Sequence, residues 1–203
     1  MKTFLANTFA KWFKRLGFAG ALRWRMLYWA YKLWPGLHIR DAEWDFVLDY
    51  LPKLDEWQEV KVLDVGATSS LFIYEIARRG YKTYGLDIRF YQEKLPININ
   101  FIIKDITQKH KFVEDWDFII CISVLEHIKY PSNALYTMAL NLKMGGRLLL
   151  TIPTNEFAQG HQWQGFNYQN IKQILPYCLH INEYTERKGQ ICLALEKIYG
   201  MVA

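Results

Sequence analysis

The sequence contains few of the residues that hold small secreted or metal-stabilised domains together. Only three of its 203 residues are cysteines, an odd number, and they are widely separated within apolar runs. This pattern excludes a disulfide framework and offers no metal-ligand spacing. We therefore expect Cys121, Cys178 and Cys192 to be buried, reduced thiols.

Long uncharged hydrophobic runs are also missing. No such stretch approaches the ~20 residues that a transmembrane helix needs, and the apolar run at 26–31 is too short for the core of a signal peptide. Hydrophobic residues nevertheless make up 51% of the chain and charged residues 22%, which excludes a disordered protein. The composition predicts a globular, cytoplasmic protein with one full-sized domain.

Acidic residues are absent from the first forty positions. Residues 1–40 hold eight basic and ten aromatic side chains, whereas residues 41–203 hold 17 basic and 20 acidic ones. Within the first segment, Leu5, Phe9 and Trp12 follow the spacing of one helical face. We predict two parts, a basic, aromatic amphipathic segment at 1–40 and a main domain at 41–203.

The basic segment has two interpretations. It could lie on an anionic membrane surface, as interfacial helices do, which would make the protein peripheral at the inner face of the membrane. It could instead pack over the ligand pocket as part of the core, since aromatic residues at helical spacing are more often buried. The main domain has only short basic pairs, so no nucleic acid partner is expected.

Beyond residue 40, short apolar stretches alternate with helical patterns. The expected strands lie at 61–65, 82–87, 98–104, 117–122, 146–152, 179–186 and 190–197. Because short strands joined by helical crossovers form parallel sheets, we expect an α/β fold with helices on both faces. The last two strands are joined through Lys188 and Gly189, too short a connection for a parallel pair, so this pair is antiparallel.

The helical patterns predict how each helix begins and which side faces the sheet. They lie at 41–51, 72–79, 132–142 and 167–175. In the first of them, Val47 belongs to the inward stripe and Glu43 lies off it. Ser132 is expected to cap the third, which includes Leu142 and is ended by the glycines that follow, and Asn167 to cap the fourth.

Small and acidic residues follow the strands, where ligands of open parallel sheets bind. Asp64 and Gly66 belong to the end of the first strand and its loop, and Asp87 ends the second strand 21 residues after the glycine. A carboxylate has two acceptor oxygens suited to a vicinal diol, and dinucleotide-binding folds place one at this distance from their glycine loop. The third and fourth strands lead into Asp105 and Ser123.

This order of features resembles the class I S-adenosylmethionine-dependent methyltransferases, over residues 60–153 for the motifs and as far as residue 197 for the topology. The resemblance implies a Rossmann-like, doubly wound, seven-stranded sheet, mostly parallel with an antiparallel C-terminal strand, and S-adenosyl-L-methionine as cofactor. It implies that Asp64 and Gly66 face the methionine part of the cofactor. It further implies that Asp87 binds the ribose hydroxyls, and that Asp105 meets the adenine amino group with Ile106 against the ring.

The first loop departs from the family pattern. The family usually has three alternating glycines, but this chain keeps Gly66 and has Thr68 and Ser70 at the next two places. Their side chains could crowd the cofactor, or their hydroxyls could cap the following helix and bind the methionine carboxylate, and we favour the second interpretation. The missing G-x-G-x-x-G motif disfavours a nicotinamide-dependent reductase, and a catalytically inert scaffold is the third alternative.

The resemblance also implies that Ser123 lines the cofactor pocket. Quinone-biosynthesis and RNA-end members of the family hold a divalent metal here with Glu-x-x-Glu-His, but Ser123 replaces the first glutamate, so no metal is expected. His127 is either a general base for a substrate hydroxyl or a structural residue. His161 and Trp163 lie in a loop where the family often meets its substrate, or they belong to an ordinary surface.

Together these features predict a methyltransferase. We expect transfer of the sulfonium methyl group of S-adenosyl-L-methionine to an oxygen, nitrogen or carbon nucleophile. The resemblance to family members with a membrane-directed segment implies a small-molecule, sugar or lipid-linked acceptor. Alignment of the reacting atoms supplies much of the rate in such a displacement, so a base is needed only for a poorly ionised hydroxyl.

Overall fold

The computed structural model describes residues 41–55, 57–69, 72–89, 99–113, 115–154 and 165–201. The segment at 1–40 lies outside the described residues, and so do Ser70, His161 and Trp163. The predictions made for these positions are therefore carried forward as predictions.

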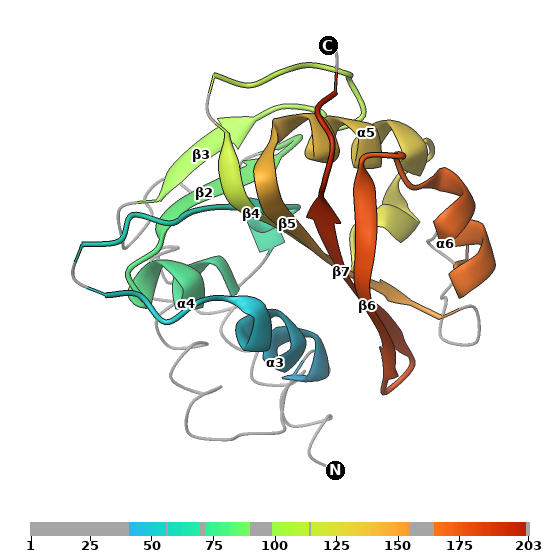
Figure 1. The fold of residues 1–203 in the computed structure, drawn as a ribbon, viewed down its shortest axis with the longest axis horizontal. Coiled ribbons are helices and arrows are strands. Elements are labelled where there is room, and N and C mark those ends of the chain that lie inside the picture. Colours follow the sequence, from blue (N-terminus) through green and yellow to red (C-terminus); the bar gives the residue numbers. More distant parts are fainter. Residues whose placement is uncertain are drawn as a thin grey trace, which may run out of the picture.

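A seven-stranded sheet in the order β3-β2-β1-β4-β5-β7-β6 forms the centre of the protein (Figure 1). Its strands are β1 (Lys61–Val65), β2 (Lys82–Asp87), β3 (Asn100–Ile103), β4 (Trp116–Ile122), β5 (Leu142–Pro153), β6 (Leu179–Arg187) and β7 (Gln190–Lys197). The first five pair in parallel, and β7 is antiparallel to both of its neighbours, which confirms the predicted sheet. The strand order reverses between β1 and β4, where α/β proteins bind their ligands.

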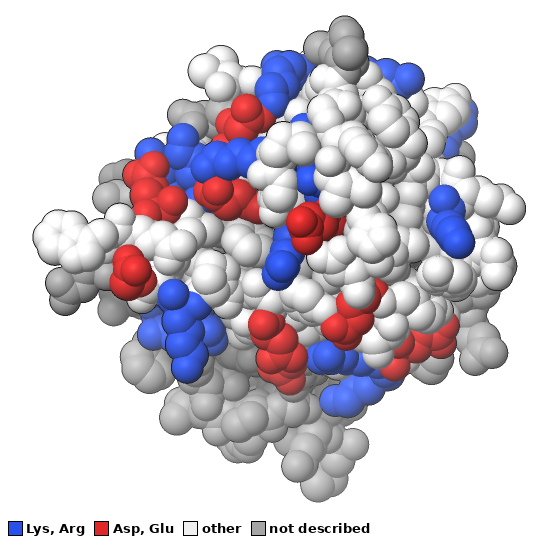
Figure 2. Space-filling view, in the orientation of Figure 1, with Lys and Arg blue, Asp and Glu red and all other residues white. Residues whose placement is uncertain are grey.

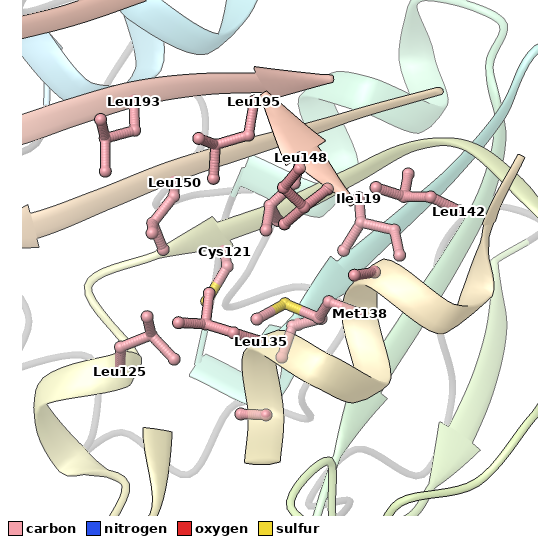
Figure 3. Packing of buried hydrophobic residues seen from close by; sticks show 14 of the residues in the cluster. Ile119, Cys121, Leu125, Leu135, Met138, Leu142, Leu148, Leu150, Leu193 and Leu195 are labelled. Carbon is pink, nitrogen blue, oxygen red and sulfur yellow. The ribbon is translucent and has the colours of Figure 1, made fainter. Parts of the chain in front are cut away.

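Helices cover both faces of the sheet, as expected. Figure 1 shows α3 (Asp41–Tyr50) and α4 (Phe72–Arg78) on one face, and α5 (Pro131–Asn141) and α6 (Tyr168–Ile174) on the other. Successive side chains along a strand therefore point to opposite faces. Ile120 of β4 belongs to the hydrophobic cluster under α3 and α4, and its neighbour Cys121 belongs to the cluster under α5. In the second cluster, Leu135 and Met138 of α5 lie close to Cys121 (Figure 3).

The start of α5 differs from the prediction. The helix begins at Pro131, with Tyr130 in the N-cap position and no side-chain cap, so the prediction that Ser132 caps it is wrong. Proline is suited to the first helical position because its φ is already helical and its missing N–H group is not needed there. Backbone preorganisation therefore replaces the hydroxyl cap.

The end of α5 also differs. The helix ends at Asn141, and Leu142 already belongs to β5, although its side chain is buried as predicted. The two glycines lie within the irregular first part of β5, so they do not end the helix. At Gly146 a Cβ atom would lie 2.9 Å from the Lys143 carbonyl oxygen, so this close approach of backbone requires glycine.

The C-terminal elements follow the prediction closely. The Asn167 side chain caps α6 by accepting a hydrogen bond from the Asn170 N–H at 3.0 Å, and the Asn170 side chain accepts from the Asn167 N–H at 2.8 Å. Lys188 and Gly189 both have positive φ, 49° and 78°, as a tight turn between antiparallel strands requires. The three cysteines are free and buried, which confirms their predicted environment.

Candidate functional site

The loop after β1 is held tightly against the loop after β4. Gly66 has a φ of 79°, and its N–H group donates to the Leu86 carbonyl oxygen at 2.8 Å. A Cβ atom at this position would lie 2.5 Å from Cγ2 of Val124. Both the backbone conformation and the close contact require glycine, so Gly66 allows the two loops to meet where the strand order reverses.

Asp87 joins the loop after β1 to the end of β2. Its Oδ2 accepts a hydrogen bond from the Thr68 N–H at 3.1 Å, and its Oδ1 accepts from the Arg89 N–H at 3.4 Å. Thr68 lies in the short turn η1 (Ala67–Ser69), and its hydroxyl donates to the Arg89 carbonyl oxygen. This hydroxyl therefore connects two loops of the site, a role that differs from the capping of α4 predicted from the sequence.

The remaining acidic positions lie along the same edge. Asp64 is 2% exposed on β1, between Gly85 of β2 and Ile120 of β4. Asp105 follows β3, and its Oδ1 accepts from the N–H and the hydroxyl of Thr107, both at 2.8 Å. Both residues thus lie near the carboxyl ends of their strands, and the contacts with Thr107 fix the carboxylate of Asp105.

Ile106, which the resemblance places against the adenine ring, is part of the hydrophobic core. It is 5% exposed and belongs to the hydrophobic cluster under α5. A cofactor ring would therefore contact only the small exposed edge of this side chain.

The loop after β4 is bound to α3 by a carboxylate that sequence reasoning missed. Ser123 donates from Oγ to Oε1 of Glu43 at 2.6 Å, and Thr151 of β5 donates from Oγ1 to the same oxygen at 2.7 Å. The Ser123 N–H group also donates to the Thr151 carbonyl oxygen at 2.9 Å. Glu43 thus joins the ends of two neighbouring strands.

The prediction that Glu43 lies off the inward stripe of its helix is wrong. Its side chain is 1% exposed, and the fully buried Phe46 and Val47 follow it by three and four positions, which places all three on one face. That spacing was visible in the sequence. The polar partners that make a buried acid tolerable were not visible, because they lie 80 and 108 residues away.

His127 ends the turn η2 (Leu125–His127) and is accessible from outside. Its side chain is 52% exposed, and its Nε2 lies 3.8 Å from Oε1 of the buried Glu126.

Burial raises the pKa of the Cys121 thiol well above its ordinary value, and the Glu126 and Asp64 carboxylates raise this pKa further. The side chains of Asp64 and Glu126 are therefore both close to the end of β4.

The groups at this edge fit S-adenosylmethionine. A carboxylate has about four lone-pair sites, and the two N–H groups bound to Asp87 use one on each oxygen, so both oxygens retain capacity for a diol. The carboxylates also suit a cationic sulfonium compound. Among the described residues, no three His, Cys, Asp or Glu side chains are arranged to hold a metal ion.

A cavity of about 610 Å³ lies elsewhere on the protein. It is lined by the end of α3, by Lys53 and Leu54, and by Arg79 and Tyr81, which precede β2. Because Asp87 is at the opposite end of β2, this cavity is separate from the site.

The chain is similar in sequence to curated methyltransferases. A ubiquinone biosynthesis O-methyltransferase of Coxiella burnetii is 30% identical over 128 residues, which cover 59% of this chain and 54% of that protein. The chain thus spans about half the length of the curated relatives it matches.

Solved structures show the same fold. A TehB-like S-adenosylmethionine-dependent methyltransferase of Corynebacterium glutamicum has a TM-score of 0.64 at 16% identity, covering 87% of this chain and 95% of that one. The N-methyltransferase NodS of Bradyrhizobium japonicum has a TM-score of 0.58 at 16% identity, covering 78% and 86%. Residues 37–188 match the family model described as a methyltransferase domain, and the chain therefore belongs to the methyltransferase domain family.

Proposed function

We propose that this protein transfers the methyl group of S-adenosylmethionine to an oxygen, nitrogen or carbon nucleophile of a small-molecule, sugar or lipid-linked acceptor. The observation that carries the proposal is the meeting of Gly66, Asp87 and the loop at Ser123 where the strand order reverses. The cofactor supplies a methyl group bound to a positively charged sulfur, and the rest of the cofactor leaves as a neutral thioether. The similarity to O-methyltransferases favours an oxygen nucleophile.

Each residue at the edge then has a defined task. Asp64 and Gly66 hold the methionine part, and Asp87 accepts hydrogen bonds from both ribose hydroxyls. Asp105 accepts from the adenine amino group, while the exposed edge of Ile106 contacts the ring. Because the held cofactor needs only correct alignment with the acceptor, positioning supplies most of the rate.

His127 is the proposed general base for a hydroxyl acceptor. Its exposed imidazole can reach a bound acceptor and take the hydroxyl proton as the new bond forms. Oε1 of the Glu126 carboxylate lies 3.8 Å from Nε2 of this ring. His161 and Trp163, outside the described residues, are proposed to contact the acceptor.

We also propose that the protein works as a peripheral protein at the cytoplasmic face of a membrane. The support is the charge and aromatic content of residues 1–40, together with the position of Glu43, which places the start of α3 at the ligand edge. No helix in the described part of the chain is long and apolar enough to cross a bilayer. In Figure 2, basic and acidic side chains are interspersed on the face shown, and we propose no nucleic acid partner.

A thermal-shift comparison tests the cofactor. S-adenosylhomocysteine, added well above its dissociation constant, should raise the Tm of the full chain by several degrees, because a ligand that binds only the folded state stabilises it. NADH and NADPH at the same concentration should leave the Tm unchanged. A shift with the nicotinamides alone would identify a reductase, and no shift with any of the three would favour an inert scaffold.

A further inference from the structure

Glu43 is a buried acid at the ligand edge of the sheet. Its helix α3 packs on β5 and β7, and the side chains that share its helical face, Phe46 and Val47, are fully buried and apolar. Removing a carboxylate from water is unfavourable, and an apolar side chain would fill this position without that penalty. Packing alone therefore does not explain why a glutamate occupies position 43.

Those hydrogen bonds converge on a single oxygen. Ser123 and Thr151 both donate their hydroxyl protons to Oε1 of Glu43, at 2.6 and 2.7 Å. Hydrogen bonds to an ionised acceptor are stronger than neutral ones. The side chain of Ser123 is thus fixed relative to both α3 and β5.

The backbone of Ser123 needs such a restraint. Its φ is 50°, in the left-handed region that residues with a Cβ atom avoid. Conformations of this kind persist only where the surroundings hold them. The hydroxyl bound to Glu43, together with the N–H group bound to the Thr151 carbonyl oxygen, holds Ser123 in this one.

The direction of the chain at Ser123 decides where Val124 lies. Val124 follows directly, and its Cγ2 occupies the space beside Gly66 that a Cβ atom there would enter, at 2.5 Å. A change of backbone conformation at Ser123 would therefore move Val124 away from Gly66. The loops on the two sides of the strand reversal depend on each other through this contact.

We propose that Glu43 is a positioning residue of the cofactor site. It holds Ser123 in the left-handed conformation and thereby fixes the separation between the loops after β1 and β4. The identity of the ligand rests on the proposed function. The competing explanation is that Glu43 only joins α3 to the sheet, in which case its loss would lower stability without changing the ligand affinity of the folded protein.

Calorimetric binding of S-adenosylhomocysteine to full-length variants separates the two explanations. Glu43→Ala and Ser123→Ala should each weaken binding about tenfold or more, while Glu43→Gln, which keeps an acceptor oxygen, should stay within about threefold of the parent. Ser123→Gly removes the hydroxyl that Glu43 binds, while glycine adopts a positive φ freely, so it serves as the background for a double-mutant comparison. Glu43→Ala should weaken binding clearly less in this background than in the parent, since no serine remains to be held.

Glu75→Ala is the matched control. Glu75 is also buried, at 2% exposed, but it lies on α4 and binds Arg78 and Arg79 at 3.1 and 2.9 Å. This variant should lower the Tm and leave the dissociation constant of S-adenosylhomocysteine unchanged. If Glu43→Ala behaved in the same way, Glu43 would be only a structural contact and the proposal would be overturned.

An NMR measurement without ligand keeps this test independent of the proposed function. Nuclear Overhauser contacts between the Val124 methyl groups and the Gly66 Hα protons should be present in the parent and in Ser123→Gly, and lost in Ser123→Ala and Glu43→Ala. If the parent failed to bind S-adenosylhomocysteine, the proposed cofactor would be wrong, and these contacts would still decide the role of Glu43. Contacts unchanged in every variant would contradict it.

Discussion

The Asp87 carboxylate accepts a hydrogen bond from the Thr68 backbone N–H at 3.1 Å, across 19 residues of sequence. The second strand is thereby attached to the loop that follows the first. The Thr68 hydroxyl reinforces this attachment by donating to the Arg89 carbonyl oxygen. Asp87 therefore has two tasks, to orient the loop and to present its remaining lone pairs to a ligand.

Asp87→Ala should remove most of the affinity for S-adenosylhomocysteine and leave the fold intact. Two hydrogen bonds to the ribose hydroxyls are lost, which corresponds to about 2–4 kcal/mol and a dissociation constant weaker by a factor of roughly 30 to 1,000. Titration calorimetry measures this directly. Asp87→Asn is the control, because its amide oxygen can still accept from Thr68 and from one hydroxyl, so it should bind with intermediate affinity. Parent-like binding by Asp87→Ala would show that the ribose lies elsewhere.

Gly66→Ala should destabilise the protein for two separable reasons. A φ of 79° is unfavourable for alanine by about 1–2 kcal/mol, and the contact of 2.5 Å with Val124 adds an overpacking penalty of about 1–3 kcal/mol. Gly145 isolates the first effect, since its φ is 73° but a Cβ atom there would meet nothing within 4 Å.

Urea unfolding of both alanine variants measures the difference. Gly66→Ala should lose clearly more free energy of unfolding than Gly145→Ala, and adding Val124→Ala should recover part of it by opening the space beside position 66. Equal losses in the two single variants would mean that the contact between the loops is unimportant.

His127→Ala should slow methyl transfer without weakening cofactor binding. General bases contribute about 10²–10⁴-fold to the rate, and the half-exposed position of His127 lets it act on the acceptor. The measurement follows labelled methyl from S-adenosylmethionine into an extract of metabolites, with S-adenosylhomocysteine affinity measured in parallel. His127→Gln serves as the control for shape and should be as slow as the alanine variant. A rate equal to that of the parent would leave His127 a structural residue.

The order and direction of the elements could be predicted because they depend on local pattern. Apolar runs such as 61–65 and 190–197 are bounded by turn residues and became strands with the predicted limits. The start of α5 was mispredicted because two local preferences competed: Ser132 is a good cap, and Pro131 is a good first residue. Such competition shifts a boundary by a residue or two and leaves the fold unchanged.

Only part of the candidate site could be predicted from the sequence. Acidic residues at the ends of strands could be found from the sequence, because strand ends are marked by the pattern that predicts the strands. Glu43 could not be found, since the hydroxyls that make its burial tolerable are 80 and 108 residues away. The same holds for the role of Thr68, whose partners lie in the loop after the second strand. Contacts between distant segments require the fold to be known.

Alkaline pH should destabilise the protein through its buried thiols. Burial, with a further contribution from Glu43, raises the pKa of Cys192 from 9.0 to about 12. A group whose pKa is higher in the folded state contributes stability below its unfolded pKa and loses it as the pH rises, because only the unfolded chain releases the proton. From about pH 8 to about pH 10 this one thiol should account for about 1.4 kcal/mol of the loss.

Urea unfolding of Cys192→Ala at those two pH values tests the assignment. The variant is less stable throughout because a buried side chain is truncated, but its free energy of unfolding should fall by about 1.4 kcal/mol less than that of the parent over this pH range. Comparing variant with parent cancels the opposing effect of Lys197, whose pKa is lowered by burial. If the free energy of unfolding had the same pH dependence in the variant and the parent, Cys192 would ionise as readily in the folded protein as in the unfolded chain.

Residues 1–40 should attach the protein to anionic membranes. The full chain should float with vesicles that contain an anionic lipid and should remain in the dense fraction when the vesicles are neutral. Each basic residue near an anionic surface contributes about 1 kcal/mol to binding. Replacing Lys11, Lys14 and Arg15 by glutamate should abolish flotation, since three attractive charges become repulsive. Salt should weaken binding by the parent, because exposed charges are screened over ~10 Å at 0.1 M.

The matched control changes the same number of charges on the described domain. It replaces three exposed lysines by glutamate, namely Lys104, Lys109 and Lys172. This control should still float, because its aromatic, basic segment is intact, although its net charge equals that of the first variant. If both variants lost flotation equally, net charge alone would be responsible. If neither the parent nor the control floated while the first variant showed a lower Tm, residues 1–40 would be packed against the domain, and the proposed membrane location would be wrong.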